Sequence, residues 1–91
     1  MRRKLTIDGI SIFIDIVETG QKLGKYQFSS SKYDIWCFDD CWEVAQEDLA
    51  WILKDKVKAY MSVPYSSMKT KSEQLKWKRY EQLHKMGLTI D

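Results

Sequence analysis

Apolar and polar residues alternate along much of the first forty positions, and this period of two predicts β-strands. Asp8-Gly9 interrupts the first alternating stretch, and this dipeptide favours a two-residue hairpin turn because both turn positions require positive φ. A hairpin in this register gathers apolar side chains on one face: Leu5, Ile7, Ile10, Ile12 and Ile14. We expect the second strand to continue to Val17, with Ile16 also on the buried face.

Two more strands are expected before residue 40. Lys25–Phe28 alternates again, and Tyr33–Phe38 forms the last strand. Residues 18–24 contain two glycines and residues 29–32 contain three serines, so both segments are interpreted as turns. Short turns between successive strands give an antiparallel meander, and residues 1–38 are therefore predicted to form a sheet with one covered face.

The apolar spacing then changes to that of a helix, which is predicted over residues 40–61. The positions expected to face the sheet are Cys41, Trp42, Ala45, Leu49, Ile52, Leu53 and Tyr60. Asp39 or Asp40 is expected to cap the helix, because Glu43 lies three residues beyond Asp40, the spacing of a reciprocal cap. Lys56 falls within the apolar stripe and must extend its ammonium group outward.

A linker over residues 62–67, which contains Pro64, and a second helix over residues 68–86 complete the prediction. Gly87 supplies the left-handed residue that ends this helix. Its inner face is expected to consist of Met68, Leu75, Leu83 and Met86, with Tyr80 beside it. Residues 1–91 are thus predicted to be one α+β domain, in which a small antiparallel sheet of about four strands is followed by two helices on one of its faces.

The composition is that of an ordinary globular domain, with 44% hydrophobic and 31% charged residues. The basic residues at positions 2–4 are not followed by an apolar run, so no secretory leader is expected. The longest apolar stretches are far shorter than the roughly 20 residues of a membrane span. The chain is therefore expected to be cytoplasmic, without a membrane partner, and its two cysteines are expected to be free thiols.

Charge is divided unevenly along the chain. Residues 1–50 contain six basic and nine acidic side chains, whereas residues 51–91 contain nine basic and four acidic ones. Six of the acids fall between Asp34 and Asp48, interleaved with Trp36, Phe38 and Trp42. This separation of charge indicates a protein that works by contacting something charged.

Little in the sequence suggests catalysis, and we expect a non-enzymatic protein without a cofactor. His84 has no neighbour in the sequence that could orient it as an acid or base, so it is interpreted as a helix-surface or packing residue. Cys37 and Cys41 lack the second Cys/His pair of a zinc site, so they are interpreted as small apolar residues and no metal is expected.

An acidic aromatic surface gives the favoured functional prediction. Val44 and Trp51 lie seven residues apart on the side of the first helix away from its apolar stripe, and carboxylates flank them. An outward Trp bordered by carboxylates is typical of the anchor of a protein interface; the alternative is that the second helix covers Trp51. The predicted partner-binding residues are Asp34, Trp36, Asp39, Asp40, Val44, Asp48, Trp51 and Asp55. The expected partner is a protein with a basic surface, such as a nucleic-acid-handling protein that this chain inhibits or regulates stoichiometrically.

The alternative function is direct DNA or RNA binding by the second helix, where lysines recur every seven residues. The residues predicted to bind nucleic acid in that case are Lys71, Lys78, Arg79, Lys85 and Trp77. Glu73 and Glu81 dilute this basic ridge, and such a ridge is commonly only a solvated helix face. The sequence pI of about 8.5 also argues mildly against nucleic acid as the sole partner, because dedicated nucleic-acid binders exceed about 9.

No family motif is evident in the chain. In size and style it is similar to small α+β proteins of phages and mobile elements, many of which block a host enzyme by occupying its binding surface. This likeness assigns no role to any residue. The strand Met1–Ile7 is expected to be an exposed sheet edge that can pair with a second copy, so the chain is expected to be a monomer or a homodimer.

Overall fold

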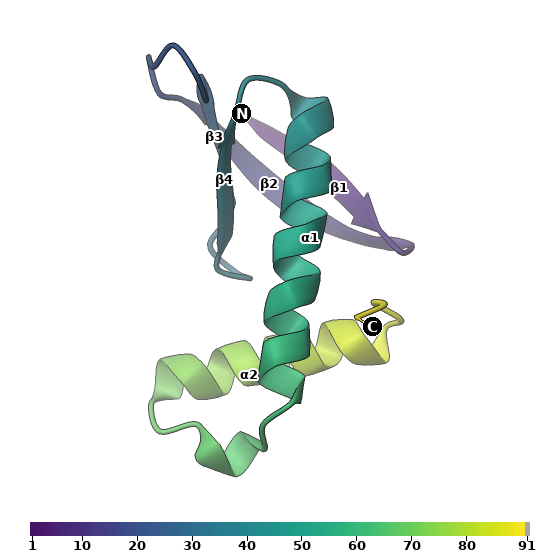
Figure 1. Cartoon of the computed structure of the whole chain (residues 1–91). Helices are drawn as coiled ribbons and strands as arrows, with labels where there is room; N and C mark the ends of the chain where they lie inside the picture. Colours follow the sequence, from purple (N-terminus) through teal and green to yellow (C-terminus); the bar gives the residue numbers. More distant parts are fainter. Residues whose placement is uncertain (91) are drawn as a thin grey trace.

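The computed structural model describes residues 1–90 as a four-stranded sheet followed by two helices, which confirms the predicted α+β fold (Figure 1). The strands are β1 (Arg2–Ile7), β2 (Ile10–Glu18), β3 (Tyr26–Ser30) and β4 (Ile35–Asp39). The helices are α1 (Trp42–Met61) and α2 (Lys71–Lys85), with a 3₁₀ turn, η1 (Tyr65–Ser67), between them. The sheet order is β1-β2-β3-β4 and every pair is antiparallel, so the predicted meander is also confirmed.

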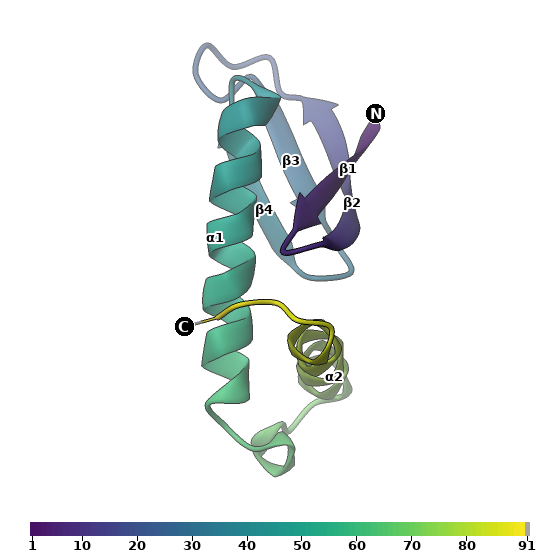
Figure 2. The ribbon, with the colours of Figure 1, turned by 90° about the vertical axis from the view of Figure 1, so that its right-hand side faces the viewer.

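Helix α1 extends along most of the molecule (Figure 1). Its first half lies beside the sheet, and its second half crosses α2 below the sheet. After a quarter turn, α1 is seen on one side of the strands, and no element of residues 1–90 covers the opposite side (Figure 2). The core therefore lies between one face of the sheet and the inner side of α1.

The first hairpin has the predicted register, with Ile7 opposite Ile10 across the turn. Asp8 and Gly9 have φ values of 50° and 80°, as the predicted turn requires. The apolar side chains expected on the inner face are all buried: Leu5, Ile7, Ile10, Ile12 and Ile14. Ile16, at the open end of the hairpin, is half-buried.

The second pair of strands is displaced by about two residues from its predicted position. Ser30 belongs to β3, where it is buried and pairs with Ile35, so the turn is formed by residues 31–34. Asp34 ends this turn with a φ of 54°. The prediction that Tyr33 begins the last strand is therefore wrong. The turn needs a left-handed residue at position 34, and a short Asp side chain tolerates that conformation, so the strand begins only after Asp34.

Helix α1 presents the expected stripe to the core, with Ala45, Leu49, Leu53 and the unpredicted Val57 buried. The predicted cap is wrong: Cys41 is the N-cap residue, and it makes no capping bond through its side chain within the described residues. The Asp40 carboxylate instead accepts a hydrogen bond from the backbone N–H of Lys25 at 3.0 Å. This contact joins the loop before β3 to the start of the helix.

Helix α2 begins at a Thr70 N-cap that was not predicted. The Thr70 hydroxyl accepts a hydrogen bond from the Glu73 backbone N–H at 3.1 Å and donates one to the Glu73 carboxylate at 3.2 Å. Its inner face was only partly predicted, since Tyr80 and Leu83 are buried but Leu75 and Met86 are exposed. Because α2 crosses α1 instead of running alongside it, only a short part of its surface reaches the core (Figure 1).

Tyr80 and Asp34 are among the side chains that connect the helices to the sheet. Tyr80, fully buried in α2, packs edge-on against Tyr60 of α1 and donates its hydroxyl to the carbonyl oxygen of Tyr33 at 2.6 Å. Asp34 forms ion pairs with Lys76 of α2 at 2.8 Å and with Lys56 of α1 at 3.6 Å. The turn before β4 is thereby fixed to both helices.

Candidate interaction surfaces

The structure distributes the predicted acidic aromatic residues over several separate places. Val44, Trp51 and Asp55 lie on the outward side of α1, whereas Trp36 lies on the uncovered side of the sheet. Asp39 and Asp48 face each other between β4 and α1, and Asp40 lies in the loop that joins these elements. Asp34 is bound to the two helices through its lysine partners.

We call the outward side of α1 the α1 outer face and define it by Val44, Glu47, Trp51 and Asp55, with the exposed Asp48 at its edge next to β4. Trp51 is 69% exposed and Val44 is 47% exposed, so α2 does not cover them. The segment from Asp39 to Leu53 contains five acidic residues and no Lys or Arg. An aromatic side chain thus projects from a strongly acidic part of the chain.

A shallow hollow of about 200 Å³ lies beside Trp51, and the sequence analysis did not foresee it. The C-terminal segment forms one of its sides with Thr89 and Ile90, since it returns along α1 (Figure 2). Asp8 holds this segment in place: its carboxylate accepts from the Thr89 backbone N–H at 2.9 Å and pairs with Lys54 at 3.2 Å. No signal in the sequence connects residues so far apart.

Asp39, Asp48 and Cys37 form a compact cluster, with one ligand-type atom from each within 4.8 Å of the others. Asp39 Oδ2 is buried and has no hydrogen-bond partner among residues 1–90. Hydrogen bonding to Asp39 is the main cause of a raised pKa at Asp48, with burial and charge repulsion adding to it. Burial and the nearby Asp39 carboxylate raise the pKa of the Cys37 thiol to about 12, so it stays a neutral thiol.

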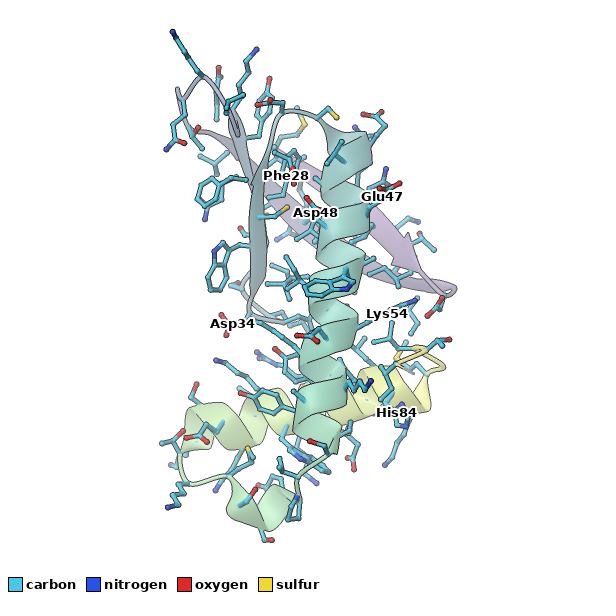
Figure 3. All side chains as sticks on the ribbon, in the orientation of Figure 1. Phe28, Asp34, Glu47, Asp48, Lys54 and His84 are labelled. Atoms are coloured by element: carbon cyan, nitrogen blue, oxygen red, sulfur yellow. The ribbon has the colours of Figure 1, made fainter. Side chains whose placement is uncertain are left out.

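Side-chain directions agree with this division of the surface (Figure 3). Asp48 lies between α1 and β4, whereas Glu47 points away from β4 on the other side of the helix. Asp34 lies at the start of β4, close to α2. The hydrogen bond from Lys76 is the main cause of the lowered pKa of Asp34, which is thus a structural carboxylate and not an open contact residue.

The predicted nucleic-acid-binding residues of α2 are partly committed to packing. The Trp77 indole N–H donates to the Val63 carbonyl oxygen at 3.0 Å, and its ring packs edge-on against Tyr65. Arg79 donates to the Lys32 carbonyl oxygen at 2.9 Å. The lysines spaced by seven, which are Lys71, Lys78 and Lys85, are all exposed. Only the charged part of the predicted surface therefore remains open.

An aromatic surface on the sheet was not predicted as a site. We call it the outer sheet face and define it by Phe13, Val17, Trp36 and Phe38, all at least half exposed. The sequence pattern could have revealed this surface, because these apolar positions alternate with the inward residues of β2 and β4. A half-buried strand normally carries polar residues at such positions, so four large exposed apolar residues on two strands are unusual there.

His84 is exposed in the last turn of α2, on the far side from the Asp39–Asp48 cluster (Figure 3). Neither of the two helices of residues 1–90 combines the length and apolar character that crossing a bilayer requires. No protein-family model, no curated protein and no solved structure matches this chain. Its own surfaces therefore carry the functional proposals.

Proposed function

We propose that this protein is a non-enzymatic protein-binding module that uses the α1 outer face to bind a partner with a basic surface. The observation that carries the proposal is the 69% exposure of Trp51 at the centre of this face. A large aromatic side chain is costly to leave in water, and Trp is among the residues that most often anchor protein interfaces.

The surroundings of Trp51 favour one kind of partner. Val44, about two helical turns away on the same helix, adds a second apolar contact. The hollow next to Trp51, which is also lined by Lys54, Asp55 and Lys58, can receive a side chain of the partner. Asp48 and Asp55 border the apolar strip. Carboxylates at the rim of an interface attract a basic surface, raise the association rate and disfavour acidic competitors.

A basic groove is a general feature of proteins that handle nucleic acids, because such a groove must neutralise phosphates. A module with an acidic aromatic face can occupy that groove in a one-to-one complex and exclude the nucleic acid. We therefore propose that the partner is a nucleic-acid-handling protein and that the effect of binding is inhibition or regulation.

The test compares the wild-type chain with a Trp51→Ala/Asp48→Ala double variant. Immobilised protein of each kind is used to capture partners from a lysate, and the affinity for the captured protein is then measured by calorimetry at low and moderate salt. Loss of an interface anchor weakens binding by about 30-fold or more. A Leu75→Ala variant serves as the matched control, because Leu75 is an exposed apolar residue on the other helix. Equal affinity of the double variant and the wild type would contradict the proposal.

Direct nucleic-acid binding by α2 is the second candidate, and the exposure of Lys71, Lys78 and Lys85 supports it. Their spacing places three ammonium groups along one side of the helix, where they can follow a phosphate backbone. The engagement of Trp77 with Val63 and Tyr65 leaves this surface without a free stacking ring. We therefore rank nucleic-acid binding by α2 below the protein-binding proposal. If α2 does bind nucleic acid, Lys78→Ala should reduce the salt dependence of that binding.

A further inference from the structure

We infer that the outer sheet face binds single-stranded nucleic acid. This surface is separate from the α1 outer face, because α1 lies on the opposite side of the strands (Figure 2). The inference is independent of the protein-binding proposal and adds a second surface to the molecule.

The aromatic side chains of this face lie in neighbouring cross-strand rows of the sheet. Trp36 lies in the row of Arg2, Asp15 and Ser29, since each of these residues pairs with the next across the strands. Phe38 lies in the next row, opposite Gln27. Trp36 and Phe38 are two residues apart on one strand, so their attachment points are about 6.6 Å apart on the same side of the sheet.

The rings are available for stacking. Phe13 is 60% exposed, Trp36 is 51% exposed and Phe38 is 50% exposed. Bases stack on aromatic side chains whatever their sequence, because every base has a π-face. Bases in a duplex are already stacked on each other and cannot lie flat on such rings, which favours single strands.

A cleft of about 330 Å³ opens beside Phe13, between β2 and the turn that joins β3 to β4. Arg2 and Lys32 contribute cations to its lining, Ser11 and Ser31 contribute hydroxyl groups, and Asp15 contributes a carboxylate that is paired with Arg2. The cations and hydroxyl groups are of the kind that bind phosphate and sugar oxygens. The cleft thus provides a place for a nucleotide next to an exposed ring.

Cations also lie next to the rings themselves. The Arg2 guanidinium is 5.4 Å from the centre of the Phe13 ring, and the Lys56 ammonium is 5.1 Å from that of Trp36. Asp15, the acid in this row, is already paired with Arg2 at 3.2 Å. Lys56 is likewise paired with Asp34 at 3.6 Å. The exposed Lys4, opposite Phe13, and Lys32 of the cleft therefore supply the cations beside the rings, and this arrangement matches a strand in which bases alternate with phosphates. The acidic α1 outer face lacks this match, so the two surfaces select partners of opposite charge.

The experiment measures the fluorescence anisotropy of labelled oligothymidine and oligouridine, each about 20 nucleotides long so that they exceed the ~4–16 nucleotides of a typical single-strand site. A DNA duplex of equal length is measured in parallel, at about 50 and 200 mM salt. We expect the single strands to bind more tightly than the duplex, with affinity falling as salt rises. Trp36→Ala/Phe38→Ala should weaken binding at least about tenfold, as expected for the loss of two stacked bases.

Two matched variants make the result specific to this surface. Trp51→Ala removes a tryptophan that is even more exposed than Trp36, from the α1 outer face, and Lys78→Ala removes a cation from α2. Neither should change single-strand affinity. All substituted side chains are exposed, and circular dichroism checks that each variant is folded.

Four results would overturn the inference. They are the absence of any anisotropy change at low salt, equal affinity for duplex and single strand, wild-type affinity of the Trp36→Ala/Phe38→Ala variant, and loss of binding in Lys78→Ala alone. The last result would assign nucleic-acid binding to α2. If no oligonucleotide binds but Trp36→Ala/Phe38→Ala abolishes a protein complex, the outer sheet face is a protein interface instead.

Discussion

Asp39 and Asp48 place carboxylate oxygens within 4.8 Å of each other across the boundary between β4 and α1. Their hydrogen bond is the main cause of the raised pKa of Asp48, so the folded protein holds a proton there more tightly than the unfolded chain does. This contribution to stability is present below the ordinary Asp value of 3.8 and is lost as pH rises through the raised pKa. We therefore expect Asp48→Asn to increase the free energy of unfolding at pH 7 by about 0.5 kcal/mol, the size typical of screened surface charges.

Urea denaturation at pH 7 and at pH 4 tests this expectation, and the gain should shrink at the lower pH. Glu47→Gln is the matched control, because Glu47 points away from Asp39 (Figure 3). If Asp48→Asn destabilises the protein at pH 7, then Asp48 is not repelled by Asp39 in the folded state.

Asp34 gives the opposite pH dependence. The hydrogen bond from Lys76, followed by the charge of Lys56, lowers the pKa of Asp34 in the folded state. Its contribution to stability is therefore present above 3.8 and is lost as pH falls through the lowered pKa. Asp34→Asn preserves tolerance of the positive φ but removes the charge, and it should cost about 1 kcal/mol at pH 7. In a series of denaturation curves, the difference from wild type should shrink as pH falls below 3.8, and an unchanged difference at low pH would contradict this role of Asp34.

Removal of the Tyr80 hydroxyl should destabilise the junction between the helices and the sheet. In Tyr80→Phe the carbonyl of Tyr33 loses its 2.6 Å hydrogen bond, at a cost of about 1–2 kcal/mol. Tyr80→Ala also leaves a cavity in the core and should cost about 3–5 kcal/mol. Chemical denaturation measures both values, with Tyr65→Phe as the control because Tyr65 is exposed. A neutral effect of Tyr80→Phe would mean that water or another donor satisfies Tyr33.

The two cysteines should differ widely in reactivity. Cys41 is exposed, whereas Cys37 is half-buried with a pKa of about 12. At pH 8 only about one in ten thousand Cys37 side chains is a thiolate, the reactive form. A thiol reagent followed by mass spectrometry should modify Cys41 first. In a Cys41→Ser variant, Cys37 should react only when guanidinium unfolds the protein; equal rates in the native state would count against the burial of its sulfur.

Features with local causes could be predicted from the sequence. Asp8-Gly9 fixes the first hairpin, because two residues with positive φ set the register of both strands. The spacing of apolar residues in α1 predicts that Val44 and Trp51 face outward, because the opposite side of that helix is needed for the core. The outer sheet face had an equally local signal, the alternation of Trp36 and Phe38 with inward residues of β4.

Features that depend on distant contacts could not be predicted. Leu75 and Met86 satisfy the helical period of α2 but remain exposed, because the angle at which α2 crosses α1 lets only Tyr80 and Leu83 reach the core. Leu88 enters the core after the helix has ended.

The sequence by itself determined the order of the elements, the register of the first hairpin and the two sides of α1, since neighbours in the chain set these through backbone preference and periodicity. The tertiary structure alone decided that Asp34 binds Lys76 and that Asp39 meets Asp48. It also separated Trp36 from Trp51, which the sequence had placed on one surface. The physical reason is that packing angles between helices and sheet decide which charges become neighbours, and no local preference encodes those angles.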